Sequence, residues 1–446
     1  MTTPPSAVTL AEASRFWFQL GWVSFGGPAG QISLLHRELV DQRRWLSERR
    51  YLHALNYCML LPGPEAMQLA TYLGWLMHGV PGGLIAGGLF VIPSVFVLTA
   101  LASIYALWGQ LPLLASVFAV LKPAVLAIVL MAAWRIGKRT LRTPLLISLA
   151  IAGFLALALF KLPYPLVVIV AGLIGLVVSR WRPAFLQTGG AHGSSAAKAD
   201  ADQADALHDD HTESPEHARF SRRRLAVTLL IWALALLVPL AGLVIAGGWN
   251  GSLALMARFF TRVALLSFGG AYAVLPYVAQ ASVEQFGWLS AAQVVDGLAL
   301  GETTPGPLIM VLAFVGFMGG WNGGVFGPPG TWIGAAAAAL VTVWFTFLPS
   351  FGFILCGAPL VEATRDNLRL SAPLTAITAA VVGVIVSLAV FFARPVLWPG
   401  GQFDAAALLL AAVALLLLLR ARWSVLSLIG AAALVGLLRG LTLLRQ

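Results

Sequence analysis

Two short motifs rich in glycine and proline interrupt apolar stretches of this chain, and each motif occurs twice. One reads SFGG, at residues 24–27 and 267–270, and the other reads PGP, at 62–64 and 305–307. Proline ends helices and glycine lets backbone N–H groups approach a ligand closely, so helix ends with free N–H groups are expected here. Such donors, with serine hydroxyls, suit a small anion, and above all a tetrahedral oxyanion.

Three basic residues could add positive charge to such a site. Arg15 and Arg258 each precede an SFGG serine by nine residues, and Lys122 lies between apolar runs. The candidate substrate-binding residues are therefore Ser24, Phe25, Gly26, Gly27, Pro28, Pro62, Gly63, Pro64, Ser267, Phe268, Gly269, Gly270, Pro305, Gly306, Pro307, Arg15, Arg258 and Lys122. Close helix packing by glycine and interfacial anchoring by the basic side chains are the competing explanations.

Carboxylates also lie beside the PGP motifs. Glu65 follows the first motif directly, and Glu302 precedes the second by three positions. Each could carry a coupling proton or could cap a half-helix N-terminus. His53 and Asp296 occupy equivalent positions in the two halves and are expected at the membrane interface. His36 is expected, with Glu38, on a solvated face.

Motifs of enzymes are absent from the sequence. It contains no phosphate-binding GxxxxGK[ST] loop, no HExxH pair and no nucleophile elbow, so we expect neither an enzyme nor ATP hydrolysis. We expect no cofactor and no metal. His208, Asp209, Asp210 and His211 could bind a metal ion, but their low-complexity surroundings favour a solvated tract. Cys58 and Cys356 fall in apolar segments, where thiols act mainly as small hydrophobic groups.

Composition indicates a membrane protein. Of 446 residues, 59% are hydrophobic and only 10% are charged, whereas about a quarter is usual in soluble domains. Apolar runs long enough for membrane helices recur, for example at 84–107, 225–246, 335–356 and 405–419. The net charge of +10 lies mainly in short loops, which encodes orientation in the membrane rather than nucleic-acid binding. The N-terminus carries no signal-peptide pattern.

The chain is also an internal duplication. A shift of 243 residues aligns SFGG with SFGG, Trp-Leu-Ser at 45–47 with 288–290, and PGP with PGP, and 14 of the 44 positions from 24 to 67 match. Further on, Pro93-Ser94 resembles Pro349-Ser350 at a larger shift, which places an insertion near 324–332. We therefore predict an N-terminal repeat at 1–179, a disordered cytoplasmic linker at 180–224 and a C-terminal repeat at 225–446.

Loop charges predict that the two repeats are inverted. The loop 36–50 carries five arginines, whereas its equivalent, 280–292, carries no lysine or arginine. The turn 108–118 has no basic residue but 361–370 has two, and 135–142 has four while 393–402 has one. The turn near 160–164 carries only Lys161, whereas its counterpart carries Arg420 and Arg422. This alternation is typical of inverted-topology repeats.

The parity of these loops predicts broken, re-entrant segments. Loops 36–50 and 135–142 both look cytoplasmic although three apolar segments separate them, so one segment must return to its own side. The segments broken by PGP and SFGG are the candidates. The fold class is therefore an all-α polytopic membrane protein, with roughly 9–13 membrane segments in two inverted repeats.

Longer stretches resemble the chromate ion transporter family, in its long-chain, two-domain form. They are SFGGPAGQISLLHRELVDQRRWLS, LNYCMLLPGPEAMQLATYLGWLMHG and GETTPGPLIMVLAFVGFMG. The family's FGGP and PGP motifs fall on 24–28 and 62–64, and their second copies on 267–270 and 305–307. Ala271 stands where Pro28 stands, so the two half-sites need not be equivalent.

The resemblance implies a multi-pass protein of the bacterial inner membrane that exports chromate, a tetrahedral dianion similar to sulfate. Energy would come from the proton gradient or the membrane potential. A sulfate-type importer, another oxyanion transporter, an anion channel and a membrane scaffold remain the alternatives. The expected partners are the oxyanion, protons and the lipid bilayer, with no nucleic acid, and a homodimer is left open.

Overall fold

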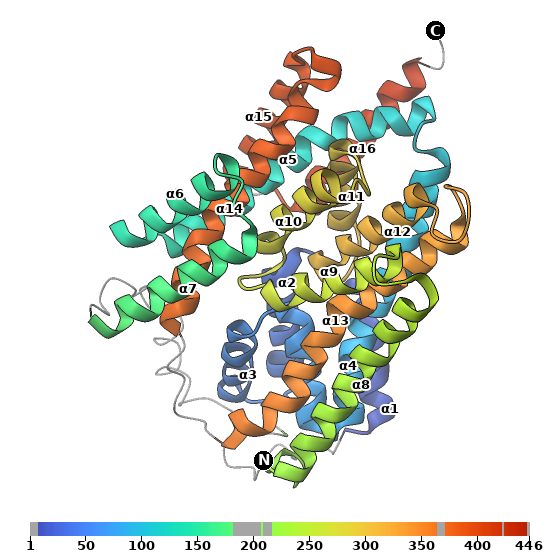
Figure 1. Ribbon diagram of the computed structural model, residues 1–446. Helices are drawn as coiled ribbons and strands as arrows, with labels where there is room; N and C mark the ends of the chain where they lie inside the picture. The colour runs from blue at the N-terminus through green and yellow to red at the C-terminus, as the bar shows by residue number, and fades with distance from the viewer. Residues whose placement is uncertain (1–7, 182–206, 208–215, 364–370, 422, 444–446) are drawn as a thin grey trace.

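The computed structural model of the chain describes residues 8–181, 207, 216–363, 371–421 and 423–443 (Figure 1). Within these ranges every regular element is a helix, which confirms the all-α prediction. The apolar runs named above fall inside α4, α8, α13 and α15, because a backbone in lipid must satisfy its own hydrogen bonds.

The helices follow the chain in two matching series. The first series comprises α1 (Leu10–Val23), α2 (Gly27–His36), a π-helix (Arg37–Gln42), α3 (Glu48–Leu60), α4 (Glu65–Trp108), α5 (Pro112–Thr140), α6 (Pro144–Ala158) and α7 (Tyr164–Trp181). The second comprises α9 (Ser252–Leu266), α10 (Ala271–Gln280), a π-helix (Ala281–Gln285), α11 (Ala291–Thr303), a 3₁₀ turn (Leu308–Met310), α12 (Val311–Gly323), α13 (Trp332–Ala363), α14 (Ser371–Leu397), α15 (Ala405–Leu419) and α16 (Val425–Leu443). Between them lie a short turn (Glu216–Ala218) and α8 (Arg222–Gly247).

Seven of the described helices are long and apolar enough to cross a membrane. They are α4, α5, α7, α8, α13, α14 and α16. Shorter apolar helices occur at 144–158, 308–323 and 405–419. The chain is therefore a polytopic membrane protein, while the exact number of segments stays a prediction.

Helix α4 is in fact two arms. His78 and Gly79 have non-helical backbone angles, and the chain reverses there. Gly74 and Gly82 then face each other so closely that a Cβ on Gly74 would lie 2.5 Å from the Gly82 carbonyl oxygen. The arm 65–77 corresponds to α12 and the longer arm to α13. The loop between α12 and α13 lies at the insertion that the sequence predicted near 324–332.

The repeated Trp-Leu-Ser motif closes each π-helix and starts the next α-helix. The N–H of Trp45 donates to the Leu39 carbonyl at 2.8 Å, and the N–H of Trp288 donates to Ser282 at the same distance. The serines Ser47 and Ser290 then cap α3 and α11 through their side chains. A serine N-cap supplies an acceptor to a free N–H of the first turn. The motif is therefore structural in both series.

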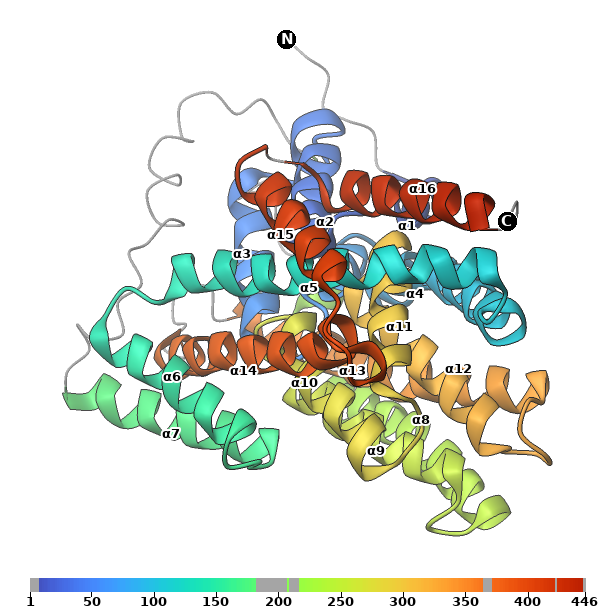
Figure 2. The ribbon, with the colours of Figure 1, turned by 90° about the horizontal axis from the view of Figure 1, so that it is seen from above.

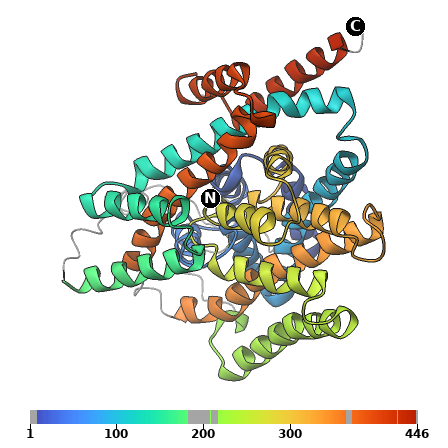
Figure 3. The ribbon, with the colours of Figure 1, turned by 45° about the horizontal axis from the view of Figure 1, so that its top comes forward.

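The C-terminal hairpins of the two series are exchanged. Helices α6 and α7 pack on α14 of the second series, while α15 and α16 pack on α5 of the first. Figure 2 shows α5 and α14 lying side by side, with α6 and α7 along α14 and α16 along α5. Helix α8 lies outside this arrangement against α13 (Figure 3), and none of its residues, all of them described, is buried.

Several predictions fall outside the described residues. The metal candidates His208, Asp209, Asp210 and His211 do so, together with Arg422 and most of the turn 361–370. Of the predicted linker 180–224, the structure describes 180–181, 207 and 216–224. Its first two residues belong to α7 and its last three to α8, so both ends are helical rather than disordered. Within its described part, His217 contacts the carbonyl oxygens of Trp75 and Leu76 at the reversal of α4.

Candidate functional site

The four Gly/Pro motifs are the points at which the short helices break. Residues 24–26 separate α1 from α2, and 61–64 separate α3 from α4; in the second series 267–270 and 304–307 do the same. Gly63 and Gly306 have φ of +132° and +94°, a backbone region that favours glycine. The helices α3 and α11 have 13 residues each, about 20 Å, which is too short to cross a hydrocarbon core of about 30 Å.

The motifs pair across the two series rather than within each. The N–H of Gly63 donates to the carbonyl oxygen of Ser267 at 2.9 Å. The N–H of Gly306 donates to the carbonyl oxygen of Ser24 at 2.7 Å. We call the Ser24–Gly306 contact the first junction and the Ser267–Gly63 contact the second junction. Each junction therefore joins the SFGG motif of one half to the PGP motif of the other.

Two further serines back these junctions. Ser94 donates its hydroxyl to the Pro305 carbonyl oxygen, and a Cβ on Gly306 would lie 1.8 Å from Ser94 Oγ. Ser350 occupies the matching place at the second junction, where a Cβ on Gly63 would lie 2.3 Å from its Oγ. The sequence marked these two serines as part of the repeat but not as part of a site. Only glycine therefore fits at the middle position of each PGP motif.

Glutamines complete both junctions. Gln31 Nε2 donates to the Ser24 carbonyl oxygen at 3.1 Å and to that of Gly306. Gln68 Nε2 donates to the Pro62 carbonyl oxygen at 2.8 Å and contacts Ser350 Oγ at 3.4 Å. Sequence reasoning missed both glutamines because each aligns with a valine in the other repeat. The repeat itself carried no signal for them.

Four buried side-chain oxygens at the junctions have no hydrogen-bond partner among the described residues. They are Ser24 Oγ, Ser267 Oγ, Gln31 Oε1 and Gln68 Oε1, on side chains that are at most 1% exposed. Leaving a buried polar atom unsatisfied costs about 1–3 kcal/mol, so such atoms call for an explanation. The two hydroxyls can donate to an oxyanion, and the two amide oxygens can accept from water or from a protonated ligand.

The predicted proton-coupling carboxylates lie beside the breaks. Glu65 is the first residue of α4, where the helix N-terminus favours negative charge. Glu302 is in the last turn of α11, and the Tyr272 hydroxyl donates to its Oε1. Arg139 interacts electrostatically with Glu65, and Arg135 does so with Tyr272. Both arginines lie in the last turns of α5, where the sequence suggested a loop.

The three basic candidates do not contact the junctions. Arg15 is exposed on α1. Arg258 donates to the Trp249 carbonyl oxygen at 2.6 Å and lies 4.1 Å from the centroid of its ring. Lys122 Nζ lies 3.4 Å from Asp296 Oδ2 instead. Asp296, which was expected at the membrane interface, is buried within the protein at 3% exposure, and its depth in the membrane stays a prediction.

The other motif residues surround the junctions. Pro62, Pro64, Pro305 and Pro307 are buried, whereas Phe25, Gly27, Pro28, Phe268 and Gly269 are partly exposed, Gly26 is exposed and Gly270 is buried. Pro28 lies in the first turn of α2, where its missing N–H costs nothing, and its counterpart Ala271 begins α10. Among the described residues no group of three histidine, cysteine or acidic side chains could hold a metal ion.

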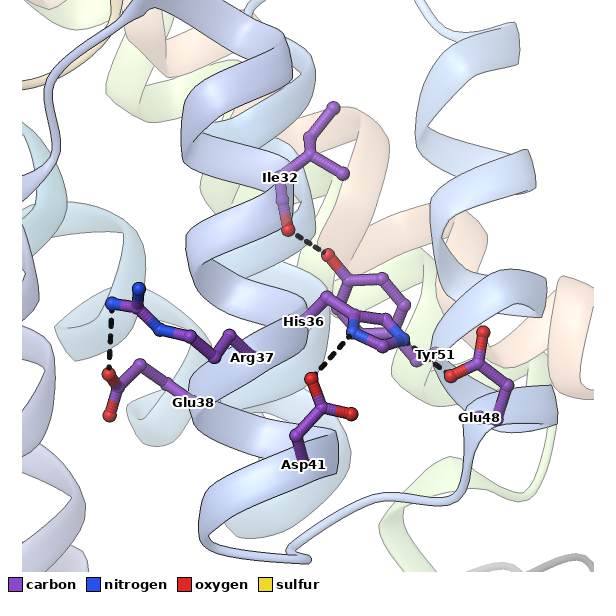
Figure 4. Close-up of polar contacts among 7 residues, drawn as sticks. All are labelled: Ile32, His36, Arg37, Glu38, Asp41, Glu48 and Tyr51. Carbon is purple, nitrogen blue, oxygen red and sulfur yellow. Dashed lines mark hydrogen bonds and ion pairs between the residues drawn. The ribbon is translucent and has the colours of Figure 1, made fainter.

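His36 belongs to a polar cluster rather than to a freely solvated face. Figure 4 shows its ring between Asp41, at 3.4 Å, and Glu48. Tyr51 packs against the same ring and donates its hydroxyl to the Ile32 carbonyl oxygen at 2.6 Å. Glu38 contacts Arg37 and Arg43. The cluster ties the π-helix to α3 and so fixes the loop after the first SFGG motif.

Helices broken at glycine and proline, packed inside a bundle of spanning helices, define the class: a polytopic α-helical membrane protein with non-helical backbone at its centre. The chain belongs to the chromate transporter family, whose sequence profile matches residues 11–176 and 254–437. The match covers both series and leaves out α8.

Similar proteins agree with this assignment. The chain is 32% identical over 387 residues to the chromate transport protein of Pseudomonas aeruginosa, covering 85% of this chain and 80% of that one. It is 27% identical to the probable chromate transport protein of Synechococcus elongatus, over 87% and 86% of the two chains. It is also 27% identical to the chromate transport protein of Cupriavidus metallidurans, over 96% and 93%. No solved structure matches significantly.

Proposed function

We propose that the protein is a secondary active carrier that exports chromate across the bacterial inner membrane, with the two junctions as its oxyanion site. The observation that carries the proposal is the pair of buried serine hydroxyls, Ser24 and Ser267, which have no partner among the described residues. A buried donor without a hydrogen-bond partner costs free energy unless a ligand accepts its hydrogen bond. The names of the three relatives support chromate as that ligand.

The junction geometry suits a tetrahedral dianion. Each half supplies one buried serine hydroxyl, Ser24 or Ser267, that has no partner among the described residues and could donate to an anion oxygen. Glu65 and Glu302, beside the breaks, are the candidate proton carriers, and Arg135 and Arg139 supply positive charge nearby. Proton gradient and membrane potential both remain energy sources under this proposal.

Inverted repeats would give the carrier its alternating access. In such proteins one repeat rocks against the other around a fixed site near the bilayer midplane. The crossed junctions join the PGP motif of each half to the other half, so movement between the halves would alter both together. The opposite loop charges of 36–50 and 280–292 support the inverted orientation, with the segment 180–224 in the cytoplasm.

The two half-sites would not contribute equally. Gln31 serves the first junction and Gln68 the second, but both belong to the N-terminal repeat. Pro28 is the second residue of α2, whereas Ala271 is the first residue of α10. We therefore assign most of the substrate-orienting side chains to the first repeat and a supporting role to the second.

Chromate uptake into inverted membrane vesicles, with sulfate as competitor, tests the proposal. Energised vesicles should accumulate chromate, and collapse of the gradient should abolish the accumulation. The matched vesicles without the protein are the control. Accumulation absent from energised vesicles would remove export, whereas strong competition by sulfate would point to a general oxyanion carrier. Chromate flux that is unchanged by collapse of the proton gradient and follows the electrochemical potential of the anion would indicate a channel.

A further inference from the structure

An ion pair lies inside the helical bundle, apart from the junction contacts. Lys122 Nζ is 3.4 Å from Asp296 Oδ2, and the Tyr105 hydroxyl donates to the same oxygen at 2.8 Å. The second carboxylate oxygen, Oδ1, is buried and has no hydrogen-bond partner in the described parts of the chain. The Asp296 side chain is 4% exposed and that of Lys122 is 24% exposed.

The pair connects the two halves of the molecule. Tyr105 is on α4 and Lys122 on α5, in the first series, whereas Asp296 is on α11 in the second. Helix α11 runs directly into the second PGP motif, which forms the first junction. Lys122 lies about 15 Å along α5 from Pro112, well inside that helix. The charge state of Asp296 therefore bears on the helix that positions the first junction.

A purely structural role explains this arrangement poorly. Removing two charges from water is costly, and an apolar pair of similar size commonly stabilises a fold as well or better. A carboxylate oxygen without a partner adds to that cost. Ionisable residues inside membrane segments mark ion and proton pathways by default.

The surroundings leave Lys122 and Asp296 to balance each other. Phe118 and Phe314 pack against the Tyr105 ring, with centroids at 5.0 and 5.4 Å. Lys122 and Tyr105 both interact electrostatically with Asp296. The exposed part of Lys122 is accessible to an anion, whereas the carboxylate is not. Protonation of Asp296 therefore leaves the Lys122 ammonium without its counter-ion.

We propose that Asp296 is a proton-binding site that is coupled to oxyanion binding through Lys122. A proton from solution forms an O–H bond at Oδ1, which leaves a neutral carboxyl group. The Lys122 ammonium keeps its positive charge, loses its counter-ion and attracts the dianion. Proton and anion then bind together. One proton with a dianion leaves one net negative charge to move, so an inside-negative potential still drives the complex outward.

This inference rests on the proposed oxyanion site, and its test separates the two. The full chain, purified in detergent, is titrated with sodium chromate by calorimetry in mildly alkaline solution, in two buffers of different ionisation enthalpy. The wild type should take up close to one proton for each anion bound. Asp296→Asn should still bind chromate but without proton uptake, and Glu284→Gln, at an exposed carboxylate on the second π-helix, should behave as wild type.

The outcomes distinguish failure of the inference from failure of the proposed function. Chromate binding by the wild type without proton uptake, or equal uptake by Asp296→Asn, would overturn the inference and leave the proposed function standing. The absence of chromate binding by the wild type would overturn both. The double variant Lys122→Gln with Asp296→Asn leaves no lone buried charge, so it covers the case in which the single variant fails to fold. It should bind chromate more weakly and with no proton uptake.

Discussion

Ser24 and Ser267 lie at the centre of the crossed junctions, and both side chains are fully buried. Their carbonyl oxygens accept the cross-repeat hydrogen bonds, while their hydroxyls have no partner among the described residues. A side chain kept for stability would normally satisfy its hydroxyl. The contrast between the satisfied backbone and the unsatisfied side chain is what the proposed function predicts for a binding residue.

Alanine substitutions of these serines should therefore separate binding from folding. We expect Ser24→Ala and Ser267→Ala to leave the thermal midpoint unchanged or slightly raised, because each removes an unsatisfied buried group. Chromate affinity should fall about tenfold or more, since a hydrogen bond to a charged group contributes about 1.5–3 kcal/mol. Calorimetric titration and thermal unfolding in detergent measure the two effects.

Ser94→Ala is the matched control for that experiment. Its hydroxyl donates to the Pro305 carbonyl oxygen, so its loss should destabilise the protein by about 1 kcal/mol. If Ser24→Ala lowered stability as Ser94→Ala does and left chromate affinity intact, the serine would be a packing residue.

The glycine of each PGP motif should tolerate no side chain. In Gly306→Ala and Gly63→Ala the new Cβ would overlap Ser94 Oγ or Ser350 Oγ, at a positive φ that L-residues avoid. We expect each to reduce chromate transport strongly and to cost about 1–3 kcal/mol of stability. Gly88→Ala, on the same helix as Ser94 and with open space at its Cβ, should leave chromate resistance of cells unchanged. A fully active Gly306→Ala protein would contradict the junction geometry.

At the scale of the elements, each half contains short helices that end at non-helical backbone. Each also contains a π-helix at the matching place, closed by the same Trp-Leu-Ser contacts. Local chemistry explains these features, because the glycines, prolines and capping serines act within a few residues of themselves. The orientation of each half in the membrane depends instead on the charges of its loops.

Cysteine labelling at equivalent positions tests the inverted orientation. Asp41 and Glu284 are exposed residues of the two π-helices and stand 243 positions apart, the offset of the repeat. In a background with Cys58 and Cys356 replaced, Asp41→Cys should react with a membrane-impermeant maleimide only in inverted vesicles. Glu284→Cys should react only in intact cells or right-side-out vesicles. Reaction of both from the same side would remove the inverted topology.

The whole molecule is held together by exchange between its halves. Helices α6 and α14 approach so closely that a Cβ on Gly383 would lie 1.8 Å from the Ala150 carbonyl oxygen. Helix α16 approaches α5 in the same manner, through Gly436 and Val117. Small residues allow this approach, which gives helices in lipid much of their packing energy.

Gly383→Val should therefore disturb assembly rather than binding chemistry. The new side chain meets backbone, which cannot move aside as a flexible side chain can, so we expect a loss of about 1–3 kcal/mol. Thermal unfolding in detergent should show a lower midpoint. Gly430→Val, on α16 with nothing near its Cβ, is the control and should leave the midpoint unchanged. Equal stability of the two variants would contradict the packing of α6 on α14.

The sequence alone determined the class of the protein, the positions of the helix breaks and the matching order of the two halves. These features follow from hydrophobicity and from glycine and proline, whose effects are local and repeat at a fixed offset. The tertiary structure decided which motifs meet. Gly63 pairs with Ser267 and Gly306 with Ser24, more than 200 residues away in each case, and no local pattern encodes such a choice.

The same reason explains the residues that the sequence did not reveal. Gln31 and Gln68 align with valines in the other repeat, so the duplication did not mark them, and Asp296, which aligns with His53, was named without its partner Lys122. Their roles come from neighbours on other helices, such as Gly306 for Gln31 and Lys122 for Asp296. Side-chain partners are set when helices pack, and only the packed structure brings these groups within hydrogen-bonding or ion-pairing distance.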